Sequence, residues 1–391
     1  MEKMKVIFQS CKISIMLLLI SLLCFPAPIF AGTPNNPLNF STSLIPFSSS
    51  EVAYTKAGGQ VFVSNAPETI NKSSHINKAL YQDTLTRRFR IWSSHVNGTK
   101  NDLKFWIYIQ NPSDTRSIDL YRSTAYGSTI SDGNNIFQAS NNVARAFLNV
   151  LPPQDQFIAT LAPGEGVPLP YAYRVSPGEA IVHLSEWVAL YSDDESGAEV
   201  SVSDINTTTS VTNPGPYALT VSATDPESSL EGDYRGVLDH YARYGTINVS
   251  LRQGESKWMK LSDSGGYSGE QENLTSVWTT SGTPSSRFVV QYNGNTRQSY
   301  WFTEYQIRFN LTSPSNVTTY FGAPLNGVGG FVNYQYATPS TNYGNTETYS
   351  YRGGGPGTAT GVIVSNVKVF NLRTLVSAGN SLPQGIYFRA S

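Results

Sequence analysis

Two stretches of the chain repeat one pattern and decide the fold class: KFWIYIQNPSD at residues 104–114 and QIRFNLTSPSN at residues 306–316. In each stretch every second residue is apolar, and the run ends in a turn that contains proline. Alternation with a period of two predicts a β-strand with one buried face, and proline flanked by Asn, Ser or Asp predicts a turn. We therefore expect two hairpins, each with one apolar face. The apolar positions lie at a constant offset of 202 residues: Phe105, Ile107 and Ile109, then Ile307, Phe309 and Leu311.

The composition of the whole chain extends this pattern. Its 391 residues include 23 Tyr, 18 Phe, 32 Gly and 22 Pro, and only 14% of them are charged. Aromatic and β-branched residues favour strands, whereas long helices need more Ala, Leu, Glu and Lys. Further strands are predicted at 60–63, 88–92, 181–191, 286–292 and 361–370, and a last one around Tyr387 and Phe388.

One segment has helical spacing instead. Four apolar residues follow one another at intervals of seven, four and three, which places them on one face of a helix: Ile136, Val143, Phe147 and Val150. The prolines at 152–153 end this helix. The sequence therefore predicts an all-β protein made of two antiparallel β-sandwich domains in tandem, with one short helix in the first.

The first 31 residues have the composition of a secretory signal. Three lysines precede an apolar run at 13–25, and Ala31 is a small residue at the expected cleavage point. Such a run is too short to span a bilayer, although an uncleaved membrane anchor stays open as the alternative. Both cysteines, Cys11 and Cys24, lie in this leader. We expect a secreted protein, extracellular or associated with the cell surface, whose mature chain has no thiol and no transmembrane segment.

The remaining 360 residues exceed what one hydrophobic core usually serves, so two domains are expected. Residues 206–216, NTTTSVTNPGP, have the composition of a linker. We place a signal peptide at 1–31, a loose lead-in at 32–50, and the two β-sandwich domains at 51–205 and 217–391. The mature chain has a net charge of about −3, which argues against a nucleic acid as partner and against a polybasic membrane contact.

A second recurrence places glutamate after glycine in a turn. It occurs as LAPGE at 161–165 and LRQGE at 251–255, with PGE at 177–179 as a partial copy. Glycine supplies the positive φ that the third position of a type II turn requires. We expect each turn to lead into an edge strand. Because the order of this turn and the hairpin differs between the two halves, a simple tandem duplication is not favoured.

Histidines and nucleophile motifs give no complete pattern of catalysis or metal binding. His75, His95, His183 and His240 are scattered singly, so a metal site would have to be assembled by the fold. We expect His95, next to an Asn-Gly turn, to be exposed, and His183 to be a hydrogen-bonded strand residue. GYSG at 266–269 and SNVK at 365–368 match the nucleophile motifs GxSxG and SxxK only in part.

Acidic residues gather at 193–195 and at 225–233, where a loop can surround a calcium ion. Neither group has the spacing of a calcium-binding loop, so solvated acidic turns are the preferred interpretation. We predict no cofactor and leave calcium open. Nothing in the sequence nominates the paired carboxylates of a glycosidase.

Aromatic residues offer one candidate binding site. The six tryptophans and many tyrosines are suited to stacking on sugar rings from a sandwich face. Trp106 lies within a predicted strand, whereas Trp258 and Trp278 adjoin polar segments rich in Gly and Ser. We therefore name Trp258 and Trp278 as exposed candidates for glycan binding, and we predict no catalytic and no metal-ligating residues.

The segment RIWSSHVNGT at 90–99, together with the hairpins and the Gly-Glu turns, resembles a group of uncharacterised exported β-sandwich proteins of Gram-positive bacteria. These are stalk-like or similar to the N-terminal region of copper amine oxidases. The resemblance covers about residues 90–200, implies a role in the cell envelope and supplies no site residues. Amine oxidase chemistry is excluded because NYQ at 333–335 and NYG at 342–344 both miss the cofactor motif N-Y-[DE].

The sequence thus predicts a non-enzymatic structural or adhesive protein of the cell surface or extracellular matrix. Its expected partner is a cell-wall or matrix polymer, or another copy of itself. One alternative is a carbohydrate-binding protein that uses exposed aromatic residues. A second alternative is a hydrolase that acts on polysaccharides.

Overall fold

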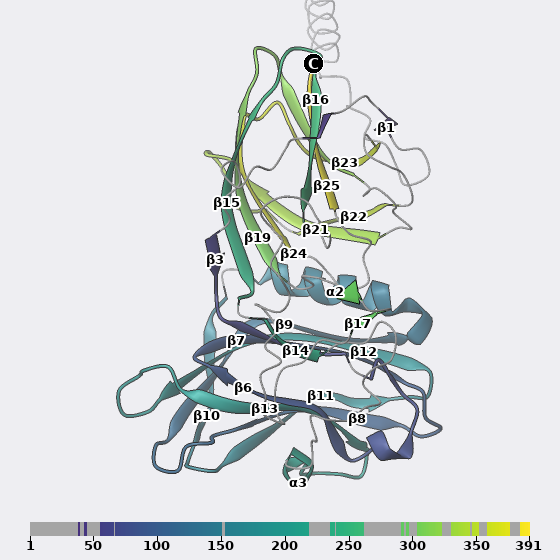
Figure 1. The fold of residues 1–391 in the computed structure, drawn as a ribbon, viewed down its shortest axis with the longest axis vertical. Helices are drawn as coiled ribbons and strands as arrows, with labels where there is room; N and C mark the ends of the chain where they lie inside the picture. The colour runs from purple at the N-terminus through teal and green to yellow at the C-terminus, as the bar shows by residue number, and fades with distance from the viewer. Residues whose placement is uncertain are drawn as a thin grey trace, which may run out of the picture.

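The computed structural model describes residues 38–39, 43–44, 55–65, 67–150, 153–218, 235–238, 240–261, 291–292, 295–296, 303–322, 330–344, 346–351, 358–375 and 384–391. The expected signal peptide at 1–31 and most of the lead-in at 32–50 lie outside these ranges. Within them the protein is all-β, with several antiparallel sheets and one helix of 14 residues, so the predicted fold class is confirmed (Figure 1). The helical segments are η1 (Ser73–His75), η2 (Gly133–Asn135), α2 (Ile136–Asn149) and α3 (Gly215–Ala218).

Two sheets that face each other form the lower part of the molecule in Figure 1, called here the lower sandwich. The larger sheet contains β4 (Gln60–Ser64), β5 (Thr69–Ile70), β7 (Arg88–Asn97), β9 (Ile118–Asp132), β10 (Asp155–Leu161), β12 (Glu179–Tyr191) and β14 (Arg235–Leu238). Its order is β10-β9-β12-β7-β4-β14, and β5 also pairs with β7. The smaller sheet contains β6 (Lys78–Thr86), β8 (Leu103–Gln110), β11 (Gly166–Val175) and β13 (Glu199–Thr208), in the order β11-β8-β13-β6. Phe62, Phe89 and Trp187 are buried between the two sheets.

Two further sheets form the upper sandwich. One contains β3 (Thr55–Ala57), β15 (Ala242–Ser250), β19 (Glu304–Thr312), β21 (Gly330–Ala337), β22 (Glu347–Tyr351) and β24 (Val369–Leu375), in the order β22-β21-β24-β19-β15-β3. The other contains β1 (Leu38–Asn39), β2 (Ser43–Leu44), β16 (Ser256–Leu261), β20 (Val317–Gly322), β23 (Thr358–Ser365) and β25 (Gln384–Ala390), in the order β1-β23-β20-β25-β16-β2. In the core between them Phe309 stacks on Phe370 and packs at a tilt against Phe388. A separate pair joins β17 (Gln291–Tyr292) to β18 (Asn295–Thr296).

The two sandwiches are not built from separate halves of the chain. Strands β1, β2 and β3, which precede the lower sandwich in sequence, pair with strands of the upper one. Conversely, β14 follows the expected linker 206–216 and pairs with β4 in the lower sandwich. The first three residues of that linker are the end of β13. Most strand pairs are antiparallel, but β4 and β5 run parallel to β7, β2 runs parallel to β16, and β15 runs parallel to β19.

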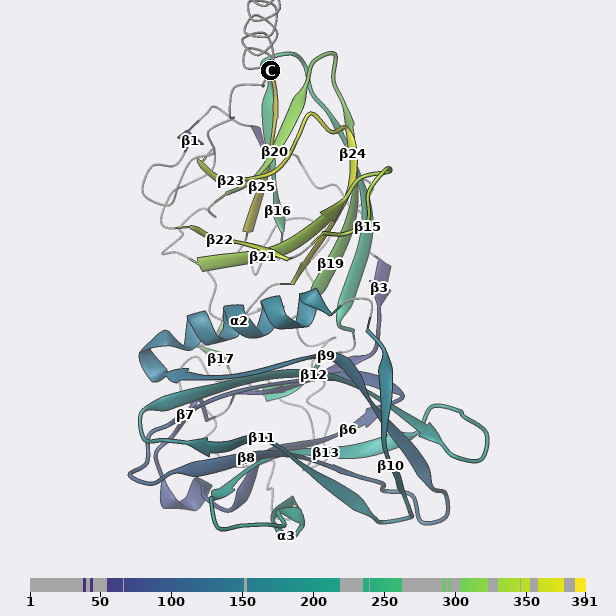
Figure 2. The ribbon, with the colours of Figure 1, turned by 180° about the vertical axis from the view of Figure 1, so that it is seen from behind.

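Helix α2 lies between the two sandwiches (Figure 2). It confirms the predicted helix, and Val143 and Phe147 on its apolar face are fully buried, whereas Val150, expected on the same face, follows the last helical residue and is 38% exposed. The helix packs on β9 and β12 below. On its other side, Asn333 Nδ2 of β21 donates to Asn141 Oδ1 at 2.6 Å, and Gln335 Nε2 donates to the Leu148 carbonyl oxygen at 3.1 Å. Its two faces therefore join the sandwiches.

The two repeated stretches form strands as predicted, but the hairpin prediction is wrong. Strand β8 pairs with β11 and β13, and the turn after it leads to β9 in the opposite sheet. Strand β19 pairs with β15 and β24, and its turn leads to β20, again in the opposite sheet. Both turns therefore carry the chain across the core, over a spacing of about 10 Å that is typical of packed sheets.

None of the helices in the described ranges is both long enough and apolar enough to span a membrane.

Candidate functional site

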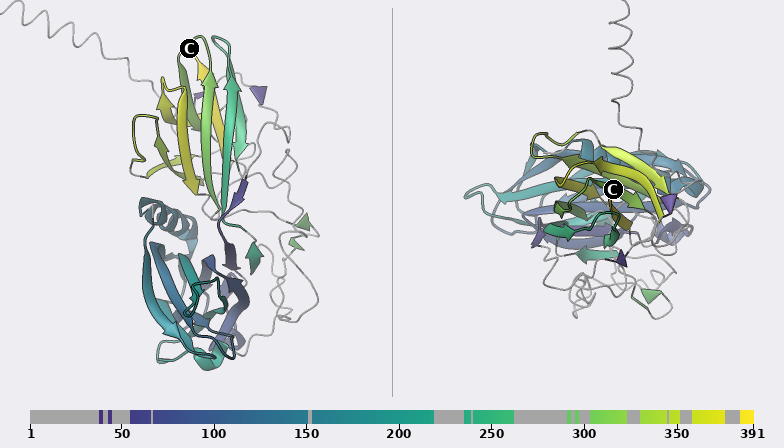
Figure 3. Two further views of the ribbon diagram at one scale, coloured as in Figure 1. Left: turned by 90° about the vertical axis from the view of Figure 1, so that its left-hand side faces the viewer. Right: turned by 90° about the horizontal axis from the view of Figure 1, so that it is seen from above.

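The outer face of the upper sandwich carries a regular array of polar side chains on β15, β19 and β24. Along β19, Ile307 and Phe309 are buried in the core, and the residues between them alternate to the outer face. Strand pairing places these outward residues in rows across the three strands. In Figure 3 (left) this face is turned toward the viewer. The rows are Tyr244, Gln306 and Arg373, then Thr246, Arg308 and Asn371, then Asn248 and Asn310.

A groove of about 710 Å³ lies over this array. Tyr244, with 41% of its surface exposed, contributes an aromatic ring on β15, and Tyr343 contributes another from the segment after β21. Arg308 is exposed on the central strand, β19, in the row next to that of Tyr244. The lining consists of Thr55, Tyr244, Gly245, Thr246, Asn248, Gln306, Ile307, Arg308, Tyr343 and Asn371.

Hydrogen bonds hold the polar side chains of the array in place. Asn310 Nδ2 donates to Asn248 Oδ1 at 2.9 Å, and Arg308 Nε donates to Asn310 Oδ1 at 3.3 Å. Gln306 Nε2 donates to Glu304 Oε1 at 2.7 Å. Side chains fixed in this way lose less conformational entropy when a ligand binds, so the groove is preorganised.

Both tyrosines of the groove keep their hydroxyl protons at neutral pH. Partial burial raises the pKa of Tyr244, and the nearby Glu304 carboxylate raises it further. Burial also raises the pKa of Tyr343, whose ring centroid lies 4.6 Å from the guanidinium carbon of Arg373. Each ring therefore offers an apolar face together with a hydroxyl that both donates and accepts.

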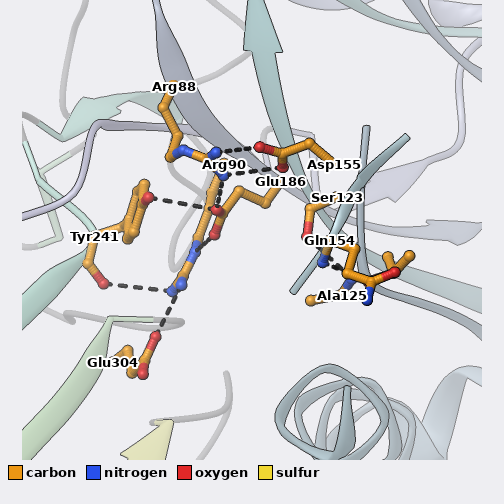
Figure 4. A network of polar contacts seen from close by, with 10 residues as sticks. Arg88, Arg90, Ser123, Ala125, Gln154, Asp155, Glu186, Tyr241 and Glu304 are labelled. Carbon is orange, nitrogen blue, oxygen red and sulfur yellow. Dashed lines mark hydrogen bonds and ion pairs between the residues drawn. The ribbon is translucent and has the colours of Figure 1, made fainter. Parts of the chain in front are cut away.

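An ion-pair network next to the groove joins the two sandwiches (Figure 4), and we call it the inter-sandwich network. Its centre is Arg90 on β7, which is 1% exposed. Arg90 Nε lies 2.9 Å from Glu186 Oε2 in the lower sandwich, and Arg90 Nη2 lies 2.9 Å from Glu304 Oε2 in the upper one. The members are Arg88, Arg90, Asp155, Glu186, Glu304 and Arg373.

The network keeps its buried groups charged. Burial by itself raises the pKa of Glu186, but the guanidinium groups of Arg90 and Arg88 hold it below the ordinary value. Burial likewise opposes the charge of Arg90, yet Glu186 and Glu304 keep its pKa above the ordinary value. Because Glu304 also accepts from Gln306, the network supports the floor of the groove.

The groove has the chemistry of a binding site for polyhydroxylated ligands. Amides, hydroxyls and a guanidinium group converge with two aromatic rings in a concave, solvent-accessible space. Aromatic faces pack against the C–H faces of sugar rings, and amide and guanidinium groups bond to their hydroxyls. Among the described residues that line it there is no carboxylate, histidine or cysteine.

Comparisons with known proteins name no family for this chain. No protein-family model matches, and no curated protein matches. Solved structures match at very low scores. A Paenibacillus xanthan lyase structure matches at 10% identity and a TM-score of 0.16, with 94% of this chain but only 27% of the lyase chain covered.

The N-terminal CBM22-1-CBM22-2 tandem domain of Xyn10C from Paenibacillus barcinonensis matches at 12% identity and a TM-score of 0.15, with 94% and 92% covered. The coconut allergen cocosin matches at 8% identity and a TM-score of 0.12, with 91% and 85% covered. Scores this low carry no argument about fold or function.

The two tryptophans named from the sequence do not lie in the groove. Trp258 on β16 was expected to be exposed, but it is 3% exposed, and its ring stacks on Tyr387 with centroids 5.7 Å apart. The expectation is wrong because β25 pairs with β16 and covers the ring with its own aromatic side chain. A ring covered in this way has no free face for a sugar. Trp278 lies outside the described residues.

His95 is the second residue whose exposure was predicted wrongly. It is fully buried in the lower sandwich, because β7 is an inner strand and the Asn97 side chain closes the turn beside it. Its Nε2 lies 3.0 Å from Asp204 Oδ2, which also accepts from Ser93 Oγ at 2.6 Å. Tyr171 donates to the other oxygen of Asp204 at 2.9 Å.

This buried cluster has the residue types of a catalytic triad in a different order. In a triad the histidine lies between the nucleophile and the acid, whereas here Asp204 is the centre. Its carboxylate stays charged because hydrogen bonds from His95 and Ser93 lower its pKa, although burial by itself raises it. Ser93, His95 and Asp204 are all fully buried in the lower sandwich.

His183 is a hydrogen-bonded residue of strand β12, as predicted, with its Nε2 2.8 Å from Ser185 Oγ, and the structure shows that it is also buried. In the acidic turn at 193–195, Asp193 and Asp194 form ion pairs with Arg116, and the pKa of each carboxyl is lowered by hydrogen bonds, that of Asp193 from Arg116 and that of Asp194 from Ser196. The acidic group at 225–233 lies outside the described residues. Within the described part of the chain, no three His, Cys, Asp or Glu side chains gather as a metal site requires.

Sequence analysis missed the groove, although part of its signal was visible. The alternation that predicted buried Ile307 and Phe309 also placed Gln306, Arg308 and Asn310 together on the opposite face. The missing information was the pairing of β19 with β15 and β24, which brings segments distant in sequence into register.

Proposed function

We propose that this protein is a secreted, non-enzymatic adhesive protein that binds a carbohydrate polymer of the cell surface or extracellular matrix in the groove. The observation that carries the proposal is the convergence of Tyr244, Tyr343 and three rows of amide, hydroxyl and guanidinium groups over one exposed sheet face. Sugars present alternating apolar and hydroxyl-rich surfaces, and this lining matches both.

A binding role fits the groove better than hydrolysis. Glycosidases use two carboxyl groups on either side of the scissile bond. Glu304, whose carboxylate accepts a hydrogen bond from the groove residue Gln306, is 3% exposed. It forms ion pairs with Arg90 and Arg373. The Glu304 carboxylate forms ion pairs within the inter-sandwich network, so it is not placed to act on a bound sugar.

Removal of the Tyr244 ring tests the proposal. Binding of the purified protein to a panel of soluble plant, bacterial and animal polysaccharides is measured by affinity electrophoresis and then by calorimetry. Tyr244→Ala is expected to weaken binding about tenfold or more, because the loss of a stacked ring costs on the order of 1–2 kcal/mol.

Tyr173→Ala is the matched control. Tyr173 lies on β11 of the lower sandwich and is 70% exposed, so its truncation leaves the groove intact. The control is expected to bind like the wild type. Equal loss in both variants, or no binding of the wild type to any polysaccharide, overturns the proposal.

A further inference from the structure

The groove has an unbalanced positive charge. Arg308 is exposed at the centre of the lining, and the other described lining residues are all uncharged. The ion pairs recorded within the described ranges include none with Arg308. Its recorded hydrogen bond goes from Nε to Asn310 Oδ1, which leaves the terminal guanidinium N–H groups beside the groove.

The charges next to the groove do not offset that of Arg308. In the inter-sandwich network the guanidinium groups of Arg88, Arg90 and Arg373 face the carboxylates of Asp155, Glu186 and Glu304. These opposite charges balance one another within the network. Among the described residues, the unbalanced charge over the groove is therefore that of Arg308, whose side chain is held by a row of two asparagines.

We propose that the groove selects an acidic polysaccharide, with Arg308 binding the carboxylate of a uronic acid residue. This inference rests on the proposed function and names its ligand class. A guanidinium group forms paired, charge-assisted hydrogen bonds with a carboxylate. Thr246 and Asn371, its neighbours across β15 and β24, supply a hydroxyl and an amide for the adjacent sugar hydroxyls.

Polygalacturonate and its methyl ester form a matched pair of ligands for the test, because they share one sugar backbone and differ only at the carboxyl group, which is charged in the acid and a neutral methyl ester in the other. The wild type is expected to bind the acid at least about tenfold more tightly than the ester. That preference is expected to shrink as salt rises from about 0.05 M to about 0.5 M, because exposed charges are screened. Calorimetry at neutral pH measures both affinities.

Two variants at one position separate charge from geometry. Arg308→Gln is expected to lose the preference, so that acid and ester bind within about threefold of each other. Arg308→Lys keeps the positive charge but lacks the planar guanidinium group that bonds a carboxylate through two N–H groups, so an intermediate preference for the acid is expected. Arg174→Gln, which removes an exposed arginine from the lower sandwich, is the control and is expected to keep the full preference.

Each outcome separates this inference from the proposed function. Equal binding of acid and ester by the wild type overturns the selection of acidic polymers and leaves carbohydrate binding in place. A preference that survives Arg308→Gln overturns the assignment to Arg308. Binding of neither ligand, nor of any polymer in the panel, overturns the proposed function and this inference with it.

Discussion

The ring of His183 is buried away from water, which would be needed to solvate its protonated form. It is 5% exposed, and it stacks on Tyr171 with ring centroids 4.5 Å apart. Burial lowers the pKa of His183 to about 4, and the positive charge of Arg122 adds to this effect while Asp204 opposes it. The residue is therefore neutral in the folded protein over most of the physiological pH range.

This burial predicts an acid sensitivity with a defined window. Between about pH 6.5 and pH 4 the unfolded chain takes up a proton at His183 that the folded protein does not, so stability falls as the pH falls. Above about pH 6.5 His183 is neutral in both the folded and the unfolded chain and costs no stability. By about pH 4 its protonation in the unfolded chain lowers the free energy of unfolding by about 3 kcal/mol. Urea unfolding at several pH values measures it. His183→Gln does not titrate and is expected to flatten the dependence, whereas the same slope in both proteins would contradict the assignment.

His183 and Trp258 show how far the environment of a single residue can be predicted from the sequence. His183 lies in a strand of strong β character, and its place in a strand follows from the local sequence alone, whereas its burial was not predicted. Trp258 lies in a polar segment, yet Tyr387 from β25, distant in sequence, covers it. Local composition placed His183 in a strand correctly and predicted the exposure of Trp258 wrongly, because burial depends on the partner strand as well as on the strand itself.

The three Gly-Glu turns are one structural element used three times. In each, glycine has a positive φ: 74° at Gly164, 82° at Gly178 and 75° at Gly254. In each, the glutamate carboxylate accepts from the backbone N–H three residues earlier, at 2.9, 2.6 and 2.8 Å. The sequence predicted a glycine turn at each position because the need for a positive φ is local, but the edge strand expected after each turn follows only the first: β11 is an edge strand, whereas β12 and β16 each lie between two neighbouring strands.

Replacing the turn glycine tests the conformational requirement without a steric clash. A Cβ at Gly164 meets nothing within 4 Å, so the cost of Gly164→Ala is that of the left-handed backbone, about 1 kcal/mol. Gly344→Ala is the control, because a Cβ there also meets nothing within 4 Å and its φ is not positive. Urea unfolding is expected to show a loss for the first and a change within about 0.5 kcal/mol for the second. Equal effects would contradict this account of the turn.

Strands and the helix were predictable as elements, but their pairing was not. Alternation placed β8 and β19 correctly, and helical spacing placed α2. The turns after β8 and β19 have ordinary hairpin composition, yet both lead to the opposite sheet. The alternation of residues in a strand specifies which face is buried, but it does not specify which strand pairs with it. The groove depends on the pairing of β15, β19 and β24.

The connectivity of the whole molecule ties the two sandwiches together. Strand β3 pairs with β15 in the upper sandwich, and the chain then enters the lower sandwich at β4. Strand β14 remains in the lower sandwich, and the chain returns to the upper one at β15. Helix α2 and Arg90 connect the same two bodies through side chains. We therefore expect unfolding in one cooperative transition.

Loss of Arg90 tests how much the inter-sandwich network contributes. Arg90→Met leaves the carboxylates of Glu186 and Glu304 buried without their shared partner, which is expected to cost about 3–5 kcal/mol of unfolding free energy. Its guanidinium also lies over the Tyr241 ring, 3.9 Å from the centroid, so a packing loss adds to the cost. Urea unfolding followed by tryptophan fluorescence measures the change.

Arg88→Met is the matched control for the network, because the Arg88 side chain is 33% exposed and its ion pairs are partly solvated. A loss of about 1 kcal/mol or less is expected there. Adding Glu186→Gln to Arg90→Met removes a buried carboxylate whose remaining ion pair is with the partly exposed Arg88, and is expected to recover part of the stability. Because Glu304 also holds Gln306, Arg90→Met is further expected to weaken glycan binding in the groove, whereas Arg88→Met is not. Equal losses in the two single variants would show that the network does not join the sandwiches energetically.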